Sequence, residues 1–318
     1  MRATVTTLVL GGLLAGLVPL APPPPLATAA PARTGAPPAM GVPTPAAAGV
    51  RAPSGDTTFS IPAGARLVIE NRSGDVEVVG TGGREAHLLV DGEVRGADVY
   101  RTGSVVRVSA GRGWEDADLS LRVPRDVEIE IHGAEGDIRV RGVERGVTIQ
   151  TVEGDIEIEG AGAVSAHSVD GDLRIRDARG PVSVNTGDGD TRLERVGGPI
   201  SVQGIDGDII VVSARASEVL LSTVGGDVWY DGTVDPRGEY ELATHDGDVT
   251  LAIPEGTGAQ VSVFTWDGSL VPSFPIQLRG TLGSVAEFTL GSGSARVKLE
   301  SFDGDIHLIR PGERTPGY

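Results

Sequence analysis

Residues 151–158 read Thr-Val-Glu-Gly-Asp-Ile-Glu-Ile, and residues 168–175 read Ser-Val-Asp-Gly-Asp-Leu-Arg-Ile. In both stretches a Gly-Asp pair opens a short run in which apolar and charged side chains alternate. The pair recurs along the chain, with its Asp at positions 137, 155, 172, 190, 208, 227 and 248. A nearly fixed step of this length is typical of a solenoid, in which each repeat forms one coil that stacks on its neighbour.

The same spacing extends toward both ends of the chain. Downstream it reaches Ser269, Glu287 and Asp305, and upstream it includes Asp75 and Asp56. The weaker matches are Asp98 and Asp118, and the period blurs at residues 86–113. We therefore predict about a dozen coils, taken one after another along the chain.

Two folds compete for this pattern. Asp-Gly sequences suit tight hairpin turns, so an antiparallel meander is the alternative to a parallel coil. In a parallel coil, residues one period apart lie about 4.8 Å from each other. That stacking would place Glu157 between Arg139 and Arg174, so that opposite charges are adjacent. We therefore predict an all-β fold, a parallel β-helix or β-solenoid with coils of 18–21 residues and two short strands in each coil.

The two strands of each predicted coil have different outward faces. The strand that follows Gly-Asp carries charged residues, whereas the strand about nine residues later carries neutral, hydrogen-bonding ones. The inward positions are mainly β-branched, which suits a narrow, stacked core. We take the neutral face as a candidate contact surface for glycan or protein, with a solvated ladder as the alternative. Its residues are Ser165, His167, Ser183, Asn185, Ser201 and Gln203.

The charged face is interrupted by three apolar residues, Ile210, Val212 and Trp229. Exposed apolar residues in a row indicate either a contact surface or a patch that the chain covers itself. The enlarged coil at residues 231–240 could fold over this patch. We favour that interpretation over a partner site.

Most turns carry two acidic residues around one glycine, as at Asp170/Asp172 and Asp188/Asp190. Stacked carboxylates about 4.8 Å apart repel by roughly 1 kcal/mol, and Ca²⁺ would suit such a ridge. However, calcium-binding nonapeptide repeats place the strand hydrophobe two residues after the Asp, whereas here it follows immediately. We therefore expect each Asp to accept hydrogen bonds from turn amides, and we predict no metal site and no cofactor.

The sequence gives little sign of catalysis. The chain has no cysteine, and neither a Gly-x-Ser-x-Gly nor a P-loop motif occurs. His132, His167, His245 and His307 have no shared spacing. A β-helix can hydrolyse polysaccharides with paired carboxylates, but the acids here are spread evenly along the repeat. We therefore predict a protein that is not an enzyme.

The N-terminal segment predicts export. Thirteen apolar residues, Leu8 to Leu20, follow Arg2 and precede the small-x-small site Ala27-Thr28-Ala29. We therefore predict a signal peptide at residues 1–29, with an uncleaved anchor helix as the alternative, and a mature chain that begins near Ala30. Residues 30–54 are rich in Ala and Pro and predict an extended linker. The solenoid is predicted at residues 55–312 and a flexible tail at residues 313–318.

The repeated element (Thr/Ser)-x-(Asp/Glu)-Gly-Asp-(Ile/Leu/Val)-x-(Ile/Val) resembles the bacterial DUF4097 family of candidate adhesins. It occurs at residues 151–158, 168–175 and 301–308, and the ending at residues 294–306 is similar to the same family. The resemblance covers residues 55–310. It implies an exported β-solenoid with an adhesive or envelope-stress role and no established catalytic residues.

These observations lead to one function and two alternatives. The first is a secreted or cell-envelope binding protein whose partner is a surface glycan or protein. The second is a structural, self-associating envelope scaffold or envelope-stress component, and the third is a polysaccharide-active enzyme. The formal net charge of −17 argues against nucleic acid or an anionic membrane surface as a partner, and we expect no membrane insertion after signal cleavage.

Overall fold

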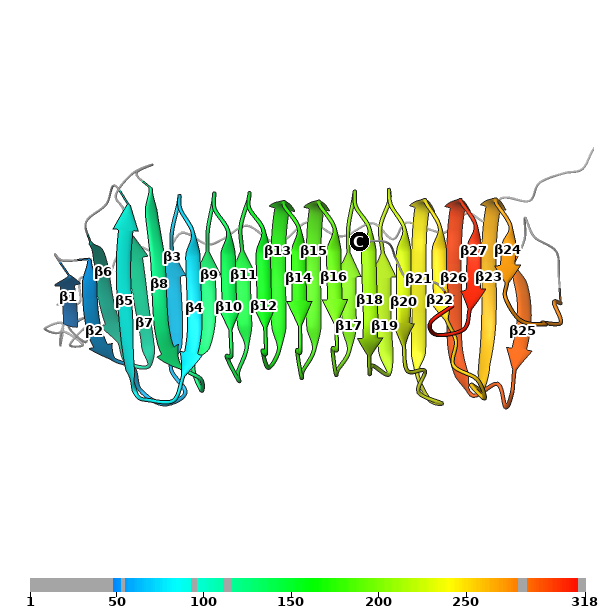
Figure 1. Cartoon of the computed structure of the whole chain (residues 1–318), viewed down its shortest axis with the longest axis horizontal. Helices are drawn as coiled ribbons and strands as arrows, with labels where there is room; N and C mark the ends of the chain where they lie inside the picture. The colour runs from blue at the N-terminus through cyan, green and yellow to red at the C-terminus, as the bar shows by residue number, and fades with distance from the viewer. Residues whose placement is uncertain (1–47, 53–54, 93–95, 111–115, 280–284, 314–318) are drawn as a thin grey trace, which may run out of the picture. The chain divides into compact units, whose positions relative to one another are not determined.

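The computed structural model describes residues 48–52, 55–92, 96–110, 116–279 and 285–313. All of these residues belong to one compact unit, Pro45–Tyr318. Every element in the described residues is a β-strand of this unit (Figure 1). The predicted signal peptide, the linker before residue 48 and residues 314–318 of the predicted tail lie outside the described residues.

The strands form two sheets that the chain visits in turn (Figure 1). Sheet A holds 14 strands, in spatial order β1 (Ala48–Ala52), β6 (Ala97–Thr102), β7 (Val105–Ala110), β3 (Arg66–Glu70), β9 (Glu128–His132), β11 (Val147–Gln150), β13 (Val164–Asp170), β15 (Val182–Asp188), β17 (Ile200–Gln203), β19 (Glu218–Ser222), β21 (Glu239–Asp246), β26 (Ala295–Asp303), β23 (Ala259–Asp267) and β25 (Ala286–Leu290).

Sheet B holds 13 strands, in spatial order β2 (Asp56–Ser60), β5 (Glu85–Gly92), β8 (Ala117–Pro124), β4 (Val76–Thr81), β10 (Ile138–Arg141), β12 (Ile156–Glu159), β14 (Leu173–Arg176), β16 (Thr191–Glu194), β18 (Ile209–Ala214), β20 (Val228–Gly232), β22 (Val249–Ala252), β27 (Ile306–Ile309) and β24 (Leu270–Pro272). The inward side chains of both sheets form one hydrophobic core.

The central coils have the predicted parallel register. In sheet B, Ile156 pairs with Ile138 on one side and with Leu173 on the other. Along β12 the isoleucines are buried, whereas the glutamates alternate with them on the outer face. The parallel β-solenoid is therefore confirmed, and the central coils are not an antiparallel meander.

The stacking order departs from the sequence order at both ends. The strand β27, which follows Asp305, lies between β22 and β24, so this late coil is inserted before the coil of Ser269. At the other end, β4 pairs directly with β10 on one side and with β8 on the other. The prediction of coils taken one after another is therefore wrong at the two ends.

Antiparallel strands end both sheets at one end of the stack and sheet A at the other, whereas β24, the last strand of sheet B, pairs parallel with β27. The antiparallel strands are β1, β2, β5 and β6 at one end and β25 at the other. Asp56, Asp98 and Glu287, which match the period, lie within such strands and do not open coils. Pairing of this kind occupies backbone groups that the last coil would otherwise leave open to another chain. The strand β1 also lies inside the segment that the sequence predicts as linker.

The ion pairs on sheet B are diagonal. Glu157 lies beside Arg174 in the register, but its carboxylate approaches Arg141 and Arg176, each at 3.4 Å. Arg139 instead binds Asp137 at 2.7 Å. The predicted stacking is therefore correct, whereas the predicted partners of Glu157 are not, because long side chains reach past the residue directly opposite.

This geometry predicts which charges are coupled. In double-mutant cycles with Glu157→Gln, we expect Arg176→Gln to show a coupling free energy of about 0.2–1 kcal/mol. Arg174→Gln, which removes the arginine directly opposite Glu157 in the register, serves as the matched control and should show almost none. Urea unfolding of the four proteins in each cycle gives both values. A larger coupling with Arg174 would contradict the diagonal pairing.

Candidate functional site

Buried hydroxyl groups fix the turn that precedes each Gly-Asp pair. The first residue of the repeated element is Ser or Thr in most coils, and its side chain is buried. Ser168 Oγ donates to the carbonyl of Asp170 in its own coil, at 3.1 Å. Thr244 Oγ1 instead donates to the carbonyl of Gly226 in the neighbouring coil, at 2.9 Å. These bonds satisfy turn carbonyls that face the interior, and they explain why the element begins with a hydroxyl residue.

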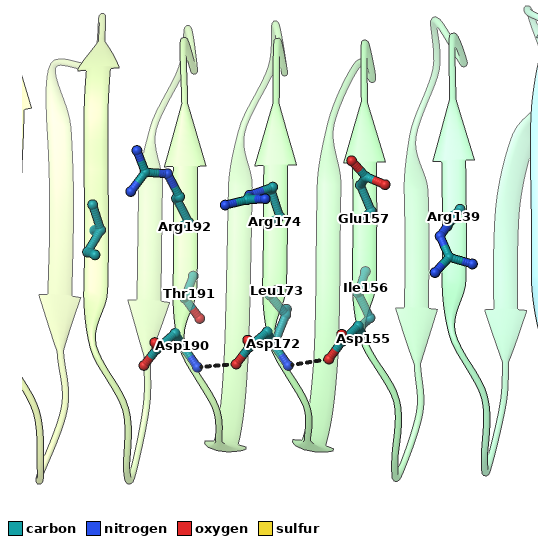
Figure 2. Close-up of a pocket in the computed structure, with 11 residues that line it drawn as sticks. Arg139, Asp155, Ile156, Glu157, Asp172, Leu173, Arg174, Asp190, Thr191 and Arg192 are labelled. Carbon is teal, nitrogen blue, oxygen red and sulfur yellow. Dashed lines mark hydrogen bonds between the residues drawn. The ribbon is translucent and has the colours of Figure 1, made fainter. Parts of the chain in front are cut away.

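The Asp of each Gly-Asp pair belongs to a continuous aspartate ladder. Its backbone N–H donates to Oδ1 of the Asp in the adjacent coil, and ten such bonds of 2.8–3.2 Å run from Asp118 to Ser269. Figure 2 shows the steps that join Asp155, Asp172 and Asp190. The prediction that these carboxylates accept hydrogen bonds from turn amides is confirmed. Burial raises the pKa of Asp227, one member of the ladder.

The second residue of the repeated element lies on the surface between the buried hydroxyl and the turn acid. In successive coils this position forms a column that we call the turn-edge stripe. Six of its members are large hydrophobic residues with 44–63% of their surface exposed. In spatial order the stripe consists of Val152, Val169, Gly187, Ile205, Val224, His245, Phe302 and Trp266.

The stripe ends in a stack of aromatic rings. His245 lies over Phe302 with a centroid distance of 4.8 Å, and Trp266 lies on the other side of Phe302 at 6.0 Å. The planes of Trp266 and Phe302 differ by only 5°. Because Trp266 is 63% exposed, the stack presents aromatic surface to solvent at this end of the stripe.

A column of carboxylates runs beside the stripe, one residue farther along each coil. These turn acids are Glu153, Asp170, Asp188, Asp206, Asp246, Asp303 and Asp267, and all are exposed. Within the described ranges none of them forms an ion pair, whereas acids on sheet B do. The Arg192 guanidinium, for example, donates to Glu194 at 2.7 Å and holds the pKa of that carboxyl below its usual range. The turn edge is therefore a row of uncompensated negative charge.

The predicted neutral face exists on sheet A. Ser165, Ser183 and Ser201 occupy one row across β13, β15 and β17. His167, Asn185 and Gln203 occupy the next outward row. In the part of the chain that the structure describes, none of these six side chains forms a hydrogen bond. The structure therefore brings all six together, and their role in contact stays a prediction.

The predicted apolar patch is less exposed than expected. Val212 and Trp229 are half-buried, but Ile210 is only 5% exposed. Ile210 lies between Arg192 and Trp229 in the outward row of sheet B, and these long side chains flank it on both sides. Exposure of Ile210 was therefore the wrong expectation.

The enlarged coil at residues 231–240 is attached to the core. Val234 packs against the hydrophobic cluster. The Tyr240 hydroxyl donates to the Ala216 carbonyl and accepts from the Asp235 amide, both at 2.7 Å. These contacts place the coil at the margin of the core, and its covering of the patch stays a prediction.

A shallow hollow of about 330 Å³ lies on the outer face of sheet B (Figure 2). Arg174 and Arg192 lie side by side across β14 and β16, and Asp172 and Asp190 line the same hollow. Guanidinium donors and carboxylate acceptors occupy two neighbouring rows there (Figure 2), so the hollow offers hydrogen bonds of both kinds to a polar ligand.

Among the described residues, no group of three or more His, Asp or Glu side chains is arranged to hold a metal ion. In the same ranges no helix is long and apolar enough to cross a membrane.

Comparison with known families decides the relationship of this chain. The family model described as Toastrack DUF4097 matches residues 50–204 and, in a second match, residues 101–309. The chain belongs to the Toastrack DUF4097 family. The resemblance inferred from the Gly-Asp repeats is therefore confirmed.

Two solved structures are similar to this Toastrack chain. One is a "putative cell adhesion protein" from Clostridium sporogenes, with 8% identity and a TM-score of 0.26, covering 80% of this chain and 98% of that one. The other is a "putative adhesin" from Bacteroides fragilis, with 14% identity and a TM-score of 0.36, covering 80% of this chain and 96% of that one. No curated protein matches the chain.

The turn-edge stripe is not among the predicted sites, although the sequence carries a signal for it. The repeated element has an unrestricted second position, and that position holds Val152, Val169 and Phe302 in the three copies that define the element. A hydrophobic residue at a variable turn position, coil after coil, is the pattern that would have predicted the stripe.

Proposed function

We propose that this Toastrack protein is an exported, non-catalytic binding protein that presents its repeated faces to a glycan or protein at the cell envelope. The observation that carries the proposal is the turn-edge stripe. Single exposed apolar residues are ordinary on protein surfaces, whereas large hydrophobic residues gathered in one place mark an interaction site. The stripe gathers six of them in one column, as three pairs separated by Gly187 and His245.

The local structure supports a role in contact for this row. The buried hydroxyl and the aspartate ladder already hold the turn. The stripe side chain, which lies between them in sequence, is therefore not needed for packing in the core. A polar residue would serve a solvated turn equally well. The presence of large hydrophobic residues at an exposed position in six of the eight coils therefore favours binding over structure alone.

Other features support the remaining parts of the proposal. The ladder carboxylates are evenly spaced and each accepts a backbone hydrogen bond, which is the arrangement of structural residues and favours a non-catalytic protein. The N-terminal apolar segment supports export. The negative charge of the turn edge favours partners other than nucleic acid and anionic membranes.

Binding that depends on the stripe tests the proposal. The mature chain, labelled with a fluorophore, is titrated onto whole bacterial cells and onto a glycan array. A stripe variant carries Val152→Ser, Val169→Ser, Ile205→Ser and Val224→Ser. We expect its affinity to fall at least about tenfold, because each buried methyl-rich side chain contributes on the order of 1 kcal/mol, while its melting temperature changes little.

Two further variants serve as controls. Leu89→Ser with Leu278→Ser removes residues that are 51% and 44% exposed elsewhere, and binding should stay unchanged. A neutral-face variant, Ser183→Ala with Asn185→Ala and Gln203→Ala, tests the alternative surface. Full binding by the stripe variant together with loss in the neutral-face variant would move the contact to sheet A. Concentration-dependent self-association without cell or glycan binding would favour the scaffold instead.

A further inference from the structure

We infer that the turn-edge stripe binds a basic, amphipathic α-helical segment of a partner protein. The apolar face of the helix would lie on the stripe, and its Lys and Arg residues would meet the turn acids. This inference rests on the proposed function, and it names the chemistry of the partner at that site.

Charge complementarity is the first argument. The turn acids lie one residue from the stripe in every coil where both are present, and within the described ranges no cation of the chain pairs with them. Neighbouring carboxylates about 4.8 Å apart repel by roughly 1 kcal/mol per pair in water. A row of cations on a partner would relieve this repulsion without breaking any existing ion pair. On sheet B, by contrast, a partner would have to displace Arg141 or Arg176 from Glu157.

The repeat distance is the second argument. Coils rise by about 4.8 Å, and one turn of an α-helix rises by about 5.4 Å. A helix parallel to the stripe therefore offers about one apolar residue per coil. The mismatch is about 0.6 Å per coil, which is about 2.4 Å over four coils and about 4.2 Å over the whole stripe, so close register holds over about four coils at a time. An extended strand repeats its apolar face about every 6.8 Å, so it would lose register within two coils.

The length of the stripe sets the length of the helix. From Glu153 to Asp267 the stripe crosses eight coils, which is about 34 Å, or about 22 residues of helix. Turn acids lie beside the stripe in seven of these eight coils, the exception being the coil of Val224, which has Gly225 at that position. The matching helix therefore carries an apolar stripe and a basic stripe along one side.

Two local features shape the site further. Gly187 leaves a notch between Val169 and Ile205, and the notch is built into the fold because a Cβ there would collide with the Val169 carbonyl. A large apolar side chain of the helix fits such a notch. At the far end, the exposed rings of Phe302 and Trp266 offer aromatic surface to a Lys or Arg side chain.

A designed peptide tests the inference directly. The probe is a 22-residue helix of Leu and Lys with all leucines on one face, and its binding to the mature chain is followed by fluorescence anisotropy. A scrambled peptide of the same composition and a Leu/Glu helix are the matched controls. We expect only the amphipathic Leu/Lys helix to bind tightly, and its affinity should fall as salt is added.

Variants of the protein locate the contact. The stripe variant has the same net charge as the wild type. A loss of at least about tenfold in its affinity for the peptide would therefore report apolar contact and not attraction by charge alone. Asp170→Asn with Asp188→Asn and Asp206→Asn should weaken binding and its salt dependence. The same charge change at exposed acids elsewhere, Asp126→Asn with Glu144→Gln and Glu255→Gln, should leave binding nearly unaltered.

The outcomes separate this inference from the proposed function. Equal binding of the scrambled peptide, or full binding by the stripe variant, would overturn the inference. Stripe-dependent binding to cells or glycans with no peptide binding would overturn it too, while the proposed function stands. Peptide binding by a protein whose attachment to cells does not depend on the stripe would support the inference, and it would contradict the stripe as the contact surface of the proposed function.

Discussion

Replacing Gly171 by alanine is expected to destabilise the solenoid by about 3 kcal/mol or more. Gly171 has a φ of 121°, which L side chains rarely adopt. A Cβ at this position would also collide with the carbonyl oxygen of Gly154 in the adjacent coil. The backbone strain and the collision act together. Relief is difficult because the coils on both sides of Gly171 are held by the stack and cannot move away.

Urea unfolding measures this effect. The matched control is Gly82→Ala, because a Cβ at Gly82 meets nothing within 4 Å and its φ is not positive. The control should change the free energy of unfolding by less than about 1 kcal/mol. A Gly171→Ala protein as stable as the control would show that the turn relaxes easily and that the Gly-Asp pair is not required by the backbone.

The central coils could be predicted because their signal is local and repeated. The Gly-Asp pair marks each turn, and the alternation after it assigns inward and outward residues one by one. Each central copy supports the same register, and a shift by one residue would bury Glu157 and expose Ile156. The fold class, the coil length and the neutral face all follow from this pattern.

The ends could not be predicted in the same way. Asp305 and Ser269 both match the period, and nothing in a local pattern says which of the two coils stacks on that of Asp248. The choice depends on pairing between segments far apart in sequence. Glu287 illustrates the same limit, since it matches the period but lies in the antiparallel strand β25.

The sequence pattern also could not predict which side chains form ion pairs or how deeply an outward side chain is buried. The register places Arg174 opposite Glu157. The carboxylate of Glu157 nevertheless pairs with the guanidinium of Arg176, its diagonal neighbour. Burial of Ile210 depends on the rotamers of its neighbours in the row. The turn-edge stripe escapes the strand pattern for a different reason: its residues lie beside the turns, outside the alternating run that follows each Gly-Asp pair.

The aspartate ladder leads to a second large effect. Asp172 Oδ1 accepts the N–H of Asp190 at 2.9 Å, and the N–H of Asp172 donates to Asp155 Oδ1 at 3.0 Å. Asp172→Ala removes one acceptor and leaves the Asp190 N–H without its partner in a tightly stacked turn. We expect a loss of about 1–3 kcal/mol in the free energy of unfolding.

Asp172→Asn separates hydrogen bonding from charge. The amide oxygen can still accept the Asp190 N–H, and the repulsion between stacked carboxylates falls by roughly 1 kcal/mol at low salt. We therefore expect this variant to be at least as stable as the wild type in low salt, with the advantage shrinking as salt is added. Asp188→Ala is the control, since the Asp188 carboxylate accepts no hydrogen bond in the described structure. If Asn were as damaging as Ala at position 172, the negative charge would be the requirement, and the ladder would have to be understood as a cation-binding ridge.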